Sequence, residues 1–571
     1  MDNAIQIPSI SSPQGGGAVK GIDEKFTVNA VNGTASLSIP LATASGRGLA
    51  PGLSIDYDSG NGNGIFGLGW SLSLSSISRK TGRRIPEYDD EADEFLLSGA
   101  EDLVPKFLSD GRGGFLQEAD GRYRVDEERQ GEALVRRYVP RTEGGFARIE
   151  RHLLPDGTLR WKVVDRANVT TLFGWSPASR LASPDGKRIF KWLPEFTYDS
   201  LGNCLAYFYE QAGAGDVDPA RLSDANRIRD GRIDFSGIYL TEVCWTNVRP
   251  WFPGAERPAK EAYRFRLEFR YERRPDAFSD GRAGFGIRTT RLCTQVLKIH
   301  RFEQLPGGEA VVSSLDPEYR KGEAFTLLES VRTTGWTRHA DGTYSRKSLP
   351  ATHFSYQEHR WDTALHSLDL EVGNGFYFTD LDGEGIPGLL LEQEGTWYYR
   401  RNLGGGRFGK PVSVKSRPSF TGASLYLADL EGDGCKQLVN LSFAPQGFFE
   451  KKDDGSWESM QPFRTLPRAE LDAPGTRMID LDGDGRADIL VSEDHVYTWY
   501  ASEGRQGFST GGSVPKAFDE NVGPNVSFVD ARQSVFLADM TGDGLVDIVR
   551  VRNGEVCYWP NLGYGRFGAK S

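Results

Sequence analysis

Short stretches of alternating apolar and polar residues recur along the whole chain and predict β-strands. Residues 26–30 alternate, Asn32-Gly33 predicts a tight turn, and residues 37–41 alternate again. Asp-Gly turn signals before further short apolar runs stand at residues 156–157, 185–186 and 341–342. Since no stretch carries apolar residues at heptad spacing, the pattern predicts an all-β fold.

The second half of the chain repeats one unit of about 50 residues. Each unit has an apolar run, an acidic glycine loop and a second apolar run, and the loops begin at Asp380, Asp429, Asp480 and Asp539. In the last unit, Asn553-Gly554 separates two strand-like runs, a strong hairpin signal. A period near 50 with about four strands per unit is typical of β-propeller blades.

These patterns predict three segments. An extended arm rich in Ser, Pro and Gly covers residues 1–22, an irregular β domain covers 23–365, and a β-propeller with integrin-type acidic loops covers 366–571. Four blades are recognisable, and the propeller could be incomplete. A chain of 571 residues has ample length for several domains.

The third loop has the ligand pattern of a hard-cation site. Side-chain oxygens at loop positions 1, 3, 5 and 9 and a backbone carbonyl at position 7 can converge on one ion. These candidates are Asp480, Asp482, Asp484, Asp488 and the carbonyl of Arg486. Unlike in an EF-hand, position 12 is Val491 and a strand-like run follows.

The fourth loop offers a similar set, and the first two do not. Its candidates are Asp539, Thr541, Asp543, Asp547 and the carbonyl of Leu545. Position 9 is Gly388 in the first loop and Gln437 in the second, so both lack that carboxylate. We therefore expect a bound ion in the third and fourth loops only. This ion should be Ca²⁺, because Mg²⁺ tolerates such flexible loops poorly. Asp-Gly loops also close through side-chain bonds to backbone amides without any ion, and this alternative stays open.

Composition excludes several classes of function. A net charge of −11 argues against nucleic acid or an anionic membrane as the main partner. No apolar run approaches the ~18 residues of a membrane span, and the N-terminus lacks a classical signal-peptide pattern. We therefore expect synthesis in the cytoplasm, export by another route and no direct membrane insertion. The five cysteines form no Cys-x-x-Cys pair and are expected to be isolated thiols.

One glycine motif is formally that of a dinucleotide site. Residues 62–67 spell G-x-G-x-x-G, but an alternating run at 71–75 follows where such a site needs a helix. We expect a loop that packs against Trp70. The seven histidines form no His-x-x-x-His pattern, so the sequence predicts no catalytic centre.

Several long phrases carry a family resemblance. They are Pro13-Gln-Gly-Gly-Gly-Ala-Val, Tyr57-Asp-Ser-Gly-Asn-Gly-Asn-Gly-Ile-Phe-Gly-Leu-Gly-Trp-Ser, Leu97-Ser-Gly-Ala-Glu-Asp-Leu-Val-Pro and Tyr558-Trp-Pro-Asn-Leu-Gly-Tyr-Gly-Arg-Phe-Gly. They resemble the SpvB-type N-terminal domain and the FG-GAP/VCBS-like propeller of the B component of bacterial toxin complexes, the Tc insecticidal toxins. The resemblance covers nearly the whole chain.

The resemblance implies a secreted, non-catalytic binding role in virulence. In that family the B and C components form a hollow shell of RHS-type sheets around a cytotoxic segment, and the B propeller docks on the pore-forming A component as a gate. The implied partners are therefore an A and a C component. The phrases reach Ser571 without an RHS shell, so encapsulation is not carried over to this chain.

Two other functions stay open. An SpvB-like ADP-ribosyltransferase needs a Glu-x-Glu pair, and Glu392-Gln393-Glu394 matches it, but the partner Ser-Thr-Ser strand is missing nearby. An integrin-like adhesion module would use the same repeats to bind a receptor or glycan. Fold alone does not separate these functions.

Overall fold

The described part of the chain is almost entirely β-structure. The computed structural model describes residues 25–571 except 29–32, 42, 45, 100, 143–145, 323, 358–361, 369–375, 416–424, 443, 453, 468–472, 510 and 530–533. The predicted arm at 1–22 lies outside these residues. The only helices among them are short 3-10 turns: η1 Pro177–Ser179, η2 Ala214–Asp216, η3 Lys260–Ala262, η4 Pro306–Gly308 and η5 Gly504–Gln506. The all-β prediction is confirmed, and no described helix is long and apolar enough to cross a membrane.

An N-terminal half contains the first 27 strands. They are β1 Lys25–Val28, β2 Ala35–Pro40, β3 Ser54–Asp58, β4 Asn63–Gly64, β5 Gly67–Leu68, β6 Trp70–Leu72, β7 Ile77–Arg79, β8 Phe95–Leu97, β9 Glu101–Pro105, β10 Glu127–Gln130, β11 Ala133–Pro140, β12 Arg148–Leu153, β13 Leu159–Val164, β14 Thr170–Phe173, β15 Arg180–Ala182, β16 Ile189–Trp192, β17 Pro194–Tyr198, β18 Cys204–Gln211, β19 Ile228–Arg229, β20 Arg232–Ile233, β21 Ile238–Asn247, β22 Tyr263–Asp280, β23 Ile287–Arg301, β24 Glu309–Arg320, β25 Leu327–Arg338, β26 Tyr344–Ser348 and β27 Thr352–His353.

Most of these strands belong to one continuous antiparallel sheet. It joins 19 strands, β7 to β18 and β21 to β27, and its longest members are β22 and β23. A separate four-stranded sheet, β1-β2-β3-β6, covers part of it. Their main shared core includes Ile39, Ile55 and Trp70 from the small sheet and Val243 and Trp245 from β21. The alternation in β2 and β3 places their apolar side chains on that face.

The glycine motif at 62–67 forms part of this packing and not a nucleotide loop. Gly64 and Gly67 pair across the two-stranded sheet β4-β5, and no helix follows. A Cβ on Gly64 would lie 2.1 Å from the carbonyl oxygen of Trp70, so only glycine fits there. The prediction of a loop packed against Trp70 is confirmed.

A repeat half contains four small antiparallel sheets in chain order. Their strands are β28 Phe376–Thr379, β29 Gly388–Gln393, β30 Thr396–Arg400 and β31 Val412–Ser413; β32 Leu425–Ala428, β33 Gln437–Asn440, β34 Gly447–Phe449 and β35 Gln461–Pro462; β36 Thr476–Ile479, β37 Asp488–Ser492, β38 Val496–Tyr500 and β39 Gly512–Pro515; β40 Val535–Ala538, β41 Asp547–Arg552 and β42 Glu555–Trp559. Each acidic loop joins the first strand of its sheet to the second. This confirms the predicted order of strand, acidic loop and strand in each unit.

Neighbouring sheets of the repeat half pack against each other. Leu390 and Trp397 of the first sheet share a core with Phe449 of the second. Val439 of the second sheet shares one with Ile489 of the third, and further side chains of the third and fourth sheets share another. The second strand of each sheet has at least three consecutive buried residues, which explains its continuous apolar run.

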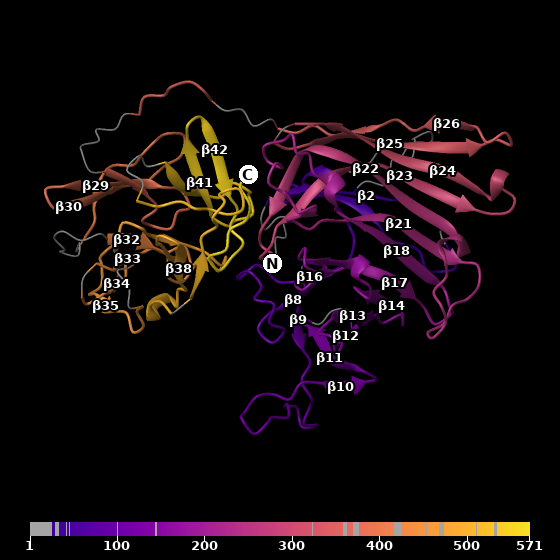
Figure 1. Ribbon diagram of the computed structural model, residues 1–571, viewed down its shortest axis with the longest axis horizontal. Coiled ribbons are helices and arrows are strands. Elements are labelled where there is room, and N and C mark those ends of the chain that lie inside the picture. The colour runs from indigo at the N-terminus through magenta and orange to yellow at the C-terminus, as the bar shows by residue number, and fades with distance from the viewer. Residues whose placement is uncertain are drawn as a thin grey trace, which may run out of the picture.

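The two halves meet through loops and not through strand pairing. Among the described residues, no strand of one half pairs with a strand of the other. Figure 1 shows the repeat half, in orange and yellow, beside the N-terminal half. The strands β41 and β42 lie on the side of the repeat half that is next to the N-terminal half. Ile85, which is 1% exposed, donates its N–H to the carbonyl of Asp482 and accepts from the Tyr564 hydroxyl, both at 2.5 Å. The third loop and the end of the chain thus both contact residue 85.

The cysteines are unpaired as predicted. Cys204, Cys244, Cys293 and Cys557 are buried and Cys435 is exposed, all as free thiols. Burial raises the pKa of the Cys293 thiol to about 12, so it stays protonated at neutral pH. The four buried thiols act as small apolar side chains in packing.

Candidate metal site

All four acidic loops close through the aspartate at position 1. In the third loop the carboxylate of Asp480 accepts the N–H groups of Gly483 and Gly485 at 2.7 and 2.9 Å. In the fourth loop Asp539 accepts the equivalent groups of Gly542 and Gly544 at 2.7 and 2.9 Å. Gly483 and Gly485 have φ of +80° and +85°, which explains the glycines at these positions.

Position 9 holds the loop to the sheet. The buried carboxylate of Asp488 accepts the N–H groups of Leu481 and Ser502 at 3.0 and 2.8 Å. In the fourth loop Asp547 accepts those of Met540 and Asn561 at 2.9 and 2.8 Å. The position 9 carboxylate therefore has a structural role, whether or not an ion is bound.

The first two loops fill this place with other groups. In the second loop the side-chain carbonyl of Gln437 accepts the N–H of Leu430 at 2.8 Å. In the first loop the Tyr399 hydroxyl accepts the N–H of Leu381 at 3.2 Å. A Cβ on Gly388 would lie 2.3 Å from that hydroxyl, so glycine makes room for the tyrosine. This substitution could not be found from ligand spacing alone.

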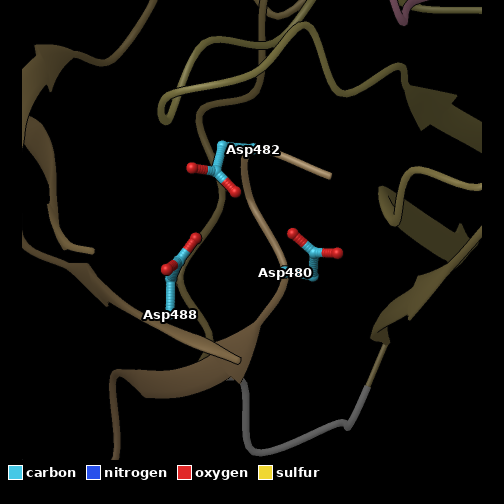
Figure 2. Close-up of side chains that lie close together, drawn as sticks. All are labelled: Asp480, Asp482 and Asp488. Atoms are coloured by element: carbon cyan, nitrogen blue, oxygen red, sulfur yellow. The ribbon is translucent and has the colours of Figure 1, made fainter. Parts of the chain in front are cut away.

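The third loop brings three carboxylates together. One oxygen each of Asp480, Asp482 and Asp488 lies within 4.8 Å of the others, and Figure 2 shows the three side chains around one point. Asp482 is 8% exposed and Asp488 1%. Asp484 lies outside this group, and its carboxylate accepts the N–H of Arg486 at 2.8 Å.

Because these carboxylates are close together and two of them are buried, their ionised forms are energetically unfavourable. Burial and the charges of Asp484 and Asp480 raise the pKa of Asp482 to about 6. Burial and the charge of Asp482 raise the pKa of Asp488 to about 8. A bound divalent cation relieves both effects, since it offsets like charges that are short of water. The residues therefore fit a hard cation.

The fourth loop is arranged differently. No group of three carboxylates as close as that of the third loop forms there in the described structure. Asp543 instead accepts the N–H of Gly281 in the N-terminal half at 2.6 Å, and Thr541 donates to Asp539 at 3.4 Å. Leu545 is buried at 3% exposure and packs beside Gly483 of the third loop. The sequence count of ligands missed the contact of Asp543 with Gly281 between the halves.

Carboxylates at position 3 of the first two loops connect parts of the repeat half. Asp382 pairs with Lys451 of the second sheet and, at 2.7 Å, with Arg401. Glu431 of the second loop accepts the N–H of Arg505, which lies in η5 between β38 and β39 of the third sheet. These loops thus use their acids for packing between sheets.

The Glu-x-Glu pair lies at a hairpin turn. Glu392 and Gln393 end β29, and Glu394 has φ of +48° in the turn to β30. All three side chains are exposed. The pair does not line the cavity described below.

Comparisons with known proteins agree with the two halves. The family described as Salmonella virulence plasmid 65kDa B protein matches residues 29–302, and the FG-GAP-like repeat matches 480–550. The mono(ADP-ribosyl)transferase SpvB of Salmonella typhimurium is 32% identical over 337 residues, which cover 53% of this chain and 54% of the relative. The chain therefore spans about half the length of the curated relatives it matches.

Solved structures extend the likeness to the whole chain. The Photorhabdus luminescens Tc holotoxin pore matches 99% of this chain and 27% of its own, at 28% identity and a TM-score of 0.76. The TcdB2-TccC3 complex matches 99% of this chain and 31% of its own, at 25% identity and a TM-score of 0.63. The chain thus joins an SpvB-type N-terminal region to FG-GAP-like repeats, as in the B component of the bacterial Tc toxins.

Proposed function

We propose that this chain is a non-catalytic binding part of a Tc-type B component and that its repeat half docks on, or gates, the pore-forming A component. The observation that carries the proposal is the likeness to the Tc holotoxin over 99% of the chain. As part of such a complex it would also contact a C component and act outside the bacterial cell.

The packing of the repeat sheets supports this role and a propeller arrangement of the repeat half. Its four sheets form meanders of one design, and each shares an apolar core with the next. Such stepwise packing is how blades build a ring. Exposed apolar side chains remain on the faces of the first and fourth sheets that point away from these shared cores, including Phe378 at 59% and Val556 at 62%. These are the faces on which further blades would continue the ring.

A transferase role has weaker support in this chain. The curated relatives carry that name, but the Glu-x-Glu pair here lies on an exposed hairpin turn. Transfer of ADP-ribose needs a site that holds NAD and shields the reacting sugar from water. The adhesion alternative shares the repeats and differs only in partner.

Binding and NAD consumption together test the proposal. The full chain is immobilised and exposed to the cognate A component, and NAD hydrolysis is followed in parallel. We expect saturable binding and a hydrolysis rate equal to buffer, unchanged in Glu394→Gln. NAD hydrolysis that Glu394→Gln abolishes would establish the transferase role instead, and binding only to host glycans would establish adhesion.

We further propose that the third loop binds Ca²⁺ through Asp480, Asp482 and Asp488. Ca²⁺ takes 6–8 oxygens, so the remaining ligands would be water and backbone oxygens such as that of Arg486. The fourth loop stays a predicted weaker site, because Asp543 is engaged by Gly281. The crowded carboxylates of the third loop support this order of affinity.

Calcium titration of matched variants tests this site. Asp482→Asn removes a clustered charge yet keeps an oxygen for the N–H of Asp484. Asp433→Asn is the control, since Asp433 is exposed on the second loop and, among the described residues, accepts the N–H of Cys435 alone. At 100-fold excess over Kd, Ca²⁺ should stabilise wild type and the control by about 2.7 kcal/mol and Asp482→Asn by much less. Equal melting of wild type with Ca²⁺ and with chelator would support ion-free, hydrogen-bonded loops.

A further inference from the structure

A cavity of about 590 Å³ lies between the first and second sheets of the repeat half. Its walls come from the first acidic loop, from β30 and the residues after it, from β31, and from residues 451, 452, 454 and 455. Figure 1 places β29 and β30 at the end of the molecule away from the N-terminal half, so the contact between the halves leaves this region open.

The cavity is cationic in a chain that is acidic overall. Two carboxylates line it, Asp382 and Asp454, against five cationic side chains: Arg401, Lys410, Lys415, Lys451 and Lys452. Asp382 is already paired with Arg401 and Lys451, which connect the two sheets. Asp454 accepts the N–H and hydroxyl of Ser456 at 2.9 and 2.6 Å, and the charges of Lys415 and Lys452 also lower its pKa, so it offsets part of the positive charge.

Three lysines are left to face solvent at the rim. Lys410, Lys415 and Lys452 are exposed, and none forms an ion pair with a carboxylate in the described part of the chain.

The floor and edge of the cavity suit an extended chain. Val412 is 67% exposed and Leu403 57%, which leaves apolar surface between the lysines. Val412 and Ser413 form β31, the edge strand of its sheet, which pairs with β30 on one side only. An edge strand presents unpaired backbone groups that can accept another strand.

We propose that this groove binds an acidic, extended peptide segment of a partner protein by strand addition to β31. Carboxylates of the segment would meet Lys410, Lys415 and Lys452, and its apolar side chains would cover Val412 and Leu403. Pairing with β31 would fix the register of the bound segment. The lysines would favour acidic segments over others and would speed their association. The inference stands apart from the proposed A-component interface and does not depend on it.

Fluorescence anisotropy with two labelled peptides tests the groove on the full chain. The first probe is Glu-Val-Glu-Val-Glu-Val-Glu, and the second is the same peptide with proline in place of the central valine. Proline removes a backbone donor and cannot join a ladder. We expect saturable binding of the first probe, weakened by salt, and at least ~10-fold weaker binding of the second. Equal affinities, or no binding of the first probe, would overturn the proposal.

Charge reversal locates the site. Lys410→Glu/Lys452→Glu should weaken the first probe by at least ~10-fold. The matched control Lys187→Glu/Lys347→Glu makes the same charge change on exposed lysines of the N-terminal half and should bind as wild type. Both double variants should have the melting temperature of wild type, because the substituted side chains are exposed. An equal loss in both pairs would show attraction to overall charge and would refute a site at the groove.

Discussion

Asp276 and Arg274 form an ion pair with no exposure of either side chain, beneath β4 and β25. The guanidinium of Arg274 also donates to Gly64 and Asn63, and Thr326 donates to Asp276. Burial alone raises the pKa of Asp276, but the bonds from Arg274 and Asn63 outweigh it and lower the pKa to about 2. The pair therefore ties the glycine loop at 62–67 to the long strands.

Asp276→Asn should destabilise the fold by about 3–5 kcal/mol, because it leaves Arg274 buried without its counter-charge. Denaturant unfolding measures this, with Asp341→Asn at an exposed turn as a control within about 0.5 kcal/mol of wild type. Since the folded pKa lies below the ordinary value of 3.8, the stabilisation is complete above pH 4 and is lost as pH falls towards 2. Equal stability of Asp276→Asn and Asp341→Asn would contradict this account of the pair.

At the scale of the element, each acidic loop depends on one buried acceptor for the N–H of its second residue. Sequence alone predicted the loops, the strands on either side and the Asn553-Gly554 hairpin, because spacing and turn chemistry are local. Asn553 and Gly554 indeed have φ of +55° and +78°. In the first loop, Tyr399 takes the acceptor role that Asp488 has in the third loop. Sequence could not predict this difference, because Tyr399 lies on a strand and not in the loop that it supports.

Gly388→Ala tests that role of Tyr399. The added Cβ would lie 2.3 Å from the Tyr399 hydroxyl and 2.7 Å from the carbonyl oxygen of Arg400, so the first sheet must shift. We expect a loss of about 1–3 kcal/mol, measured by thermal or denaturant unfolding. Gly409→Ala in the same unit is the control, because its nearest neighbour would be 3.7 Å away. A neutral Gly388→Ala would mean that Tyr399 does not hold this loop.

At the scale of the whole molecule, the two halves are joined by groups that no sequence pattern marked. Gly281 meets Asp543, Ile85 meets Asp482 and Tyr564, and the Asn226 amide donates to the carbonyl of Lys570 at 3.0 Å. These contacts join residues hundreds of positions apart, which periodicity within one segment cannot reveal. The boundary near residue 365 stays a prediction, and limited proteolysis should release a fragment that begins between about 355 and 372.

After such a cut, the halves of wild type should still co-migrate on gel filtration because these contacts remain. Gly281→Ala should separate them more readily, since its Cβ would lie 2.4 Å from the carbonyl oxygen of Asn561 in the repeat half. Gly286→Ala is the control, with a nearest neighbour at 3.7 Å. If the two halves of the cleaved wild type eluted separately on gel filtration, the contacts would be too weak to hold them together.

Hydrogen–deuterium exchange of the full chain with and without its cognate A component tests the central proposal most directly. Docking by the repeat half predicts slower exchange in strands between residues 376 and 571 and little change in β7 to β18. Protection confined to the N-terminal half, or no protection at a saturating concentration of the A component, would contradict a toxin-complex role for the repeats.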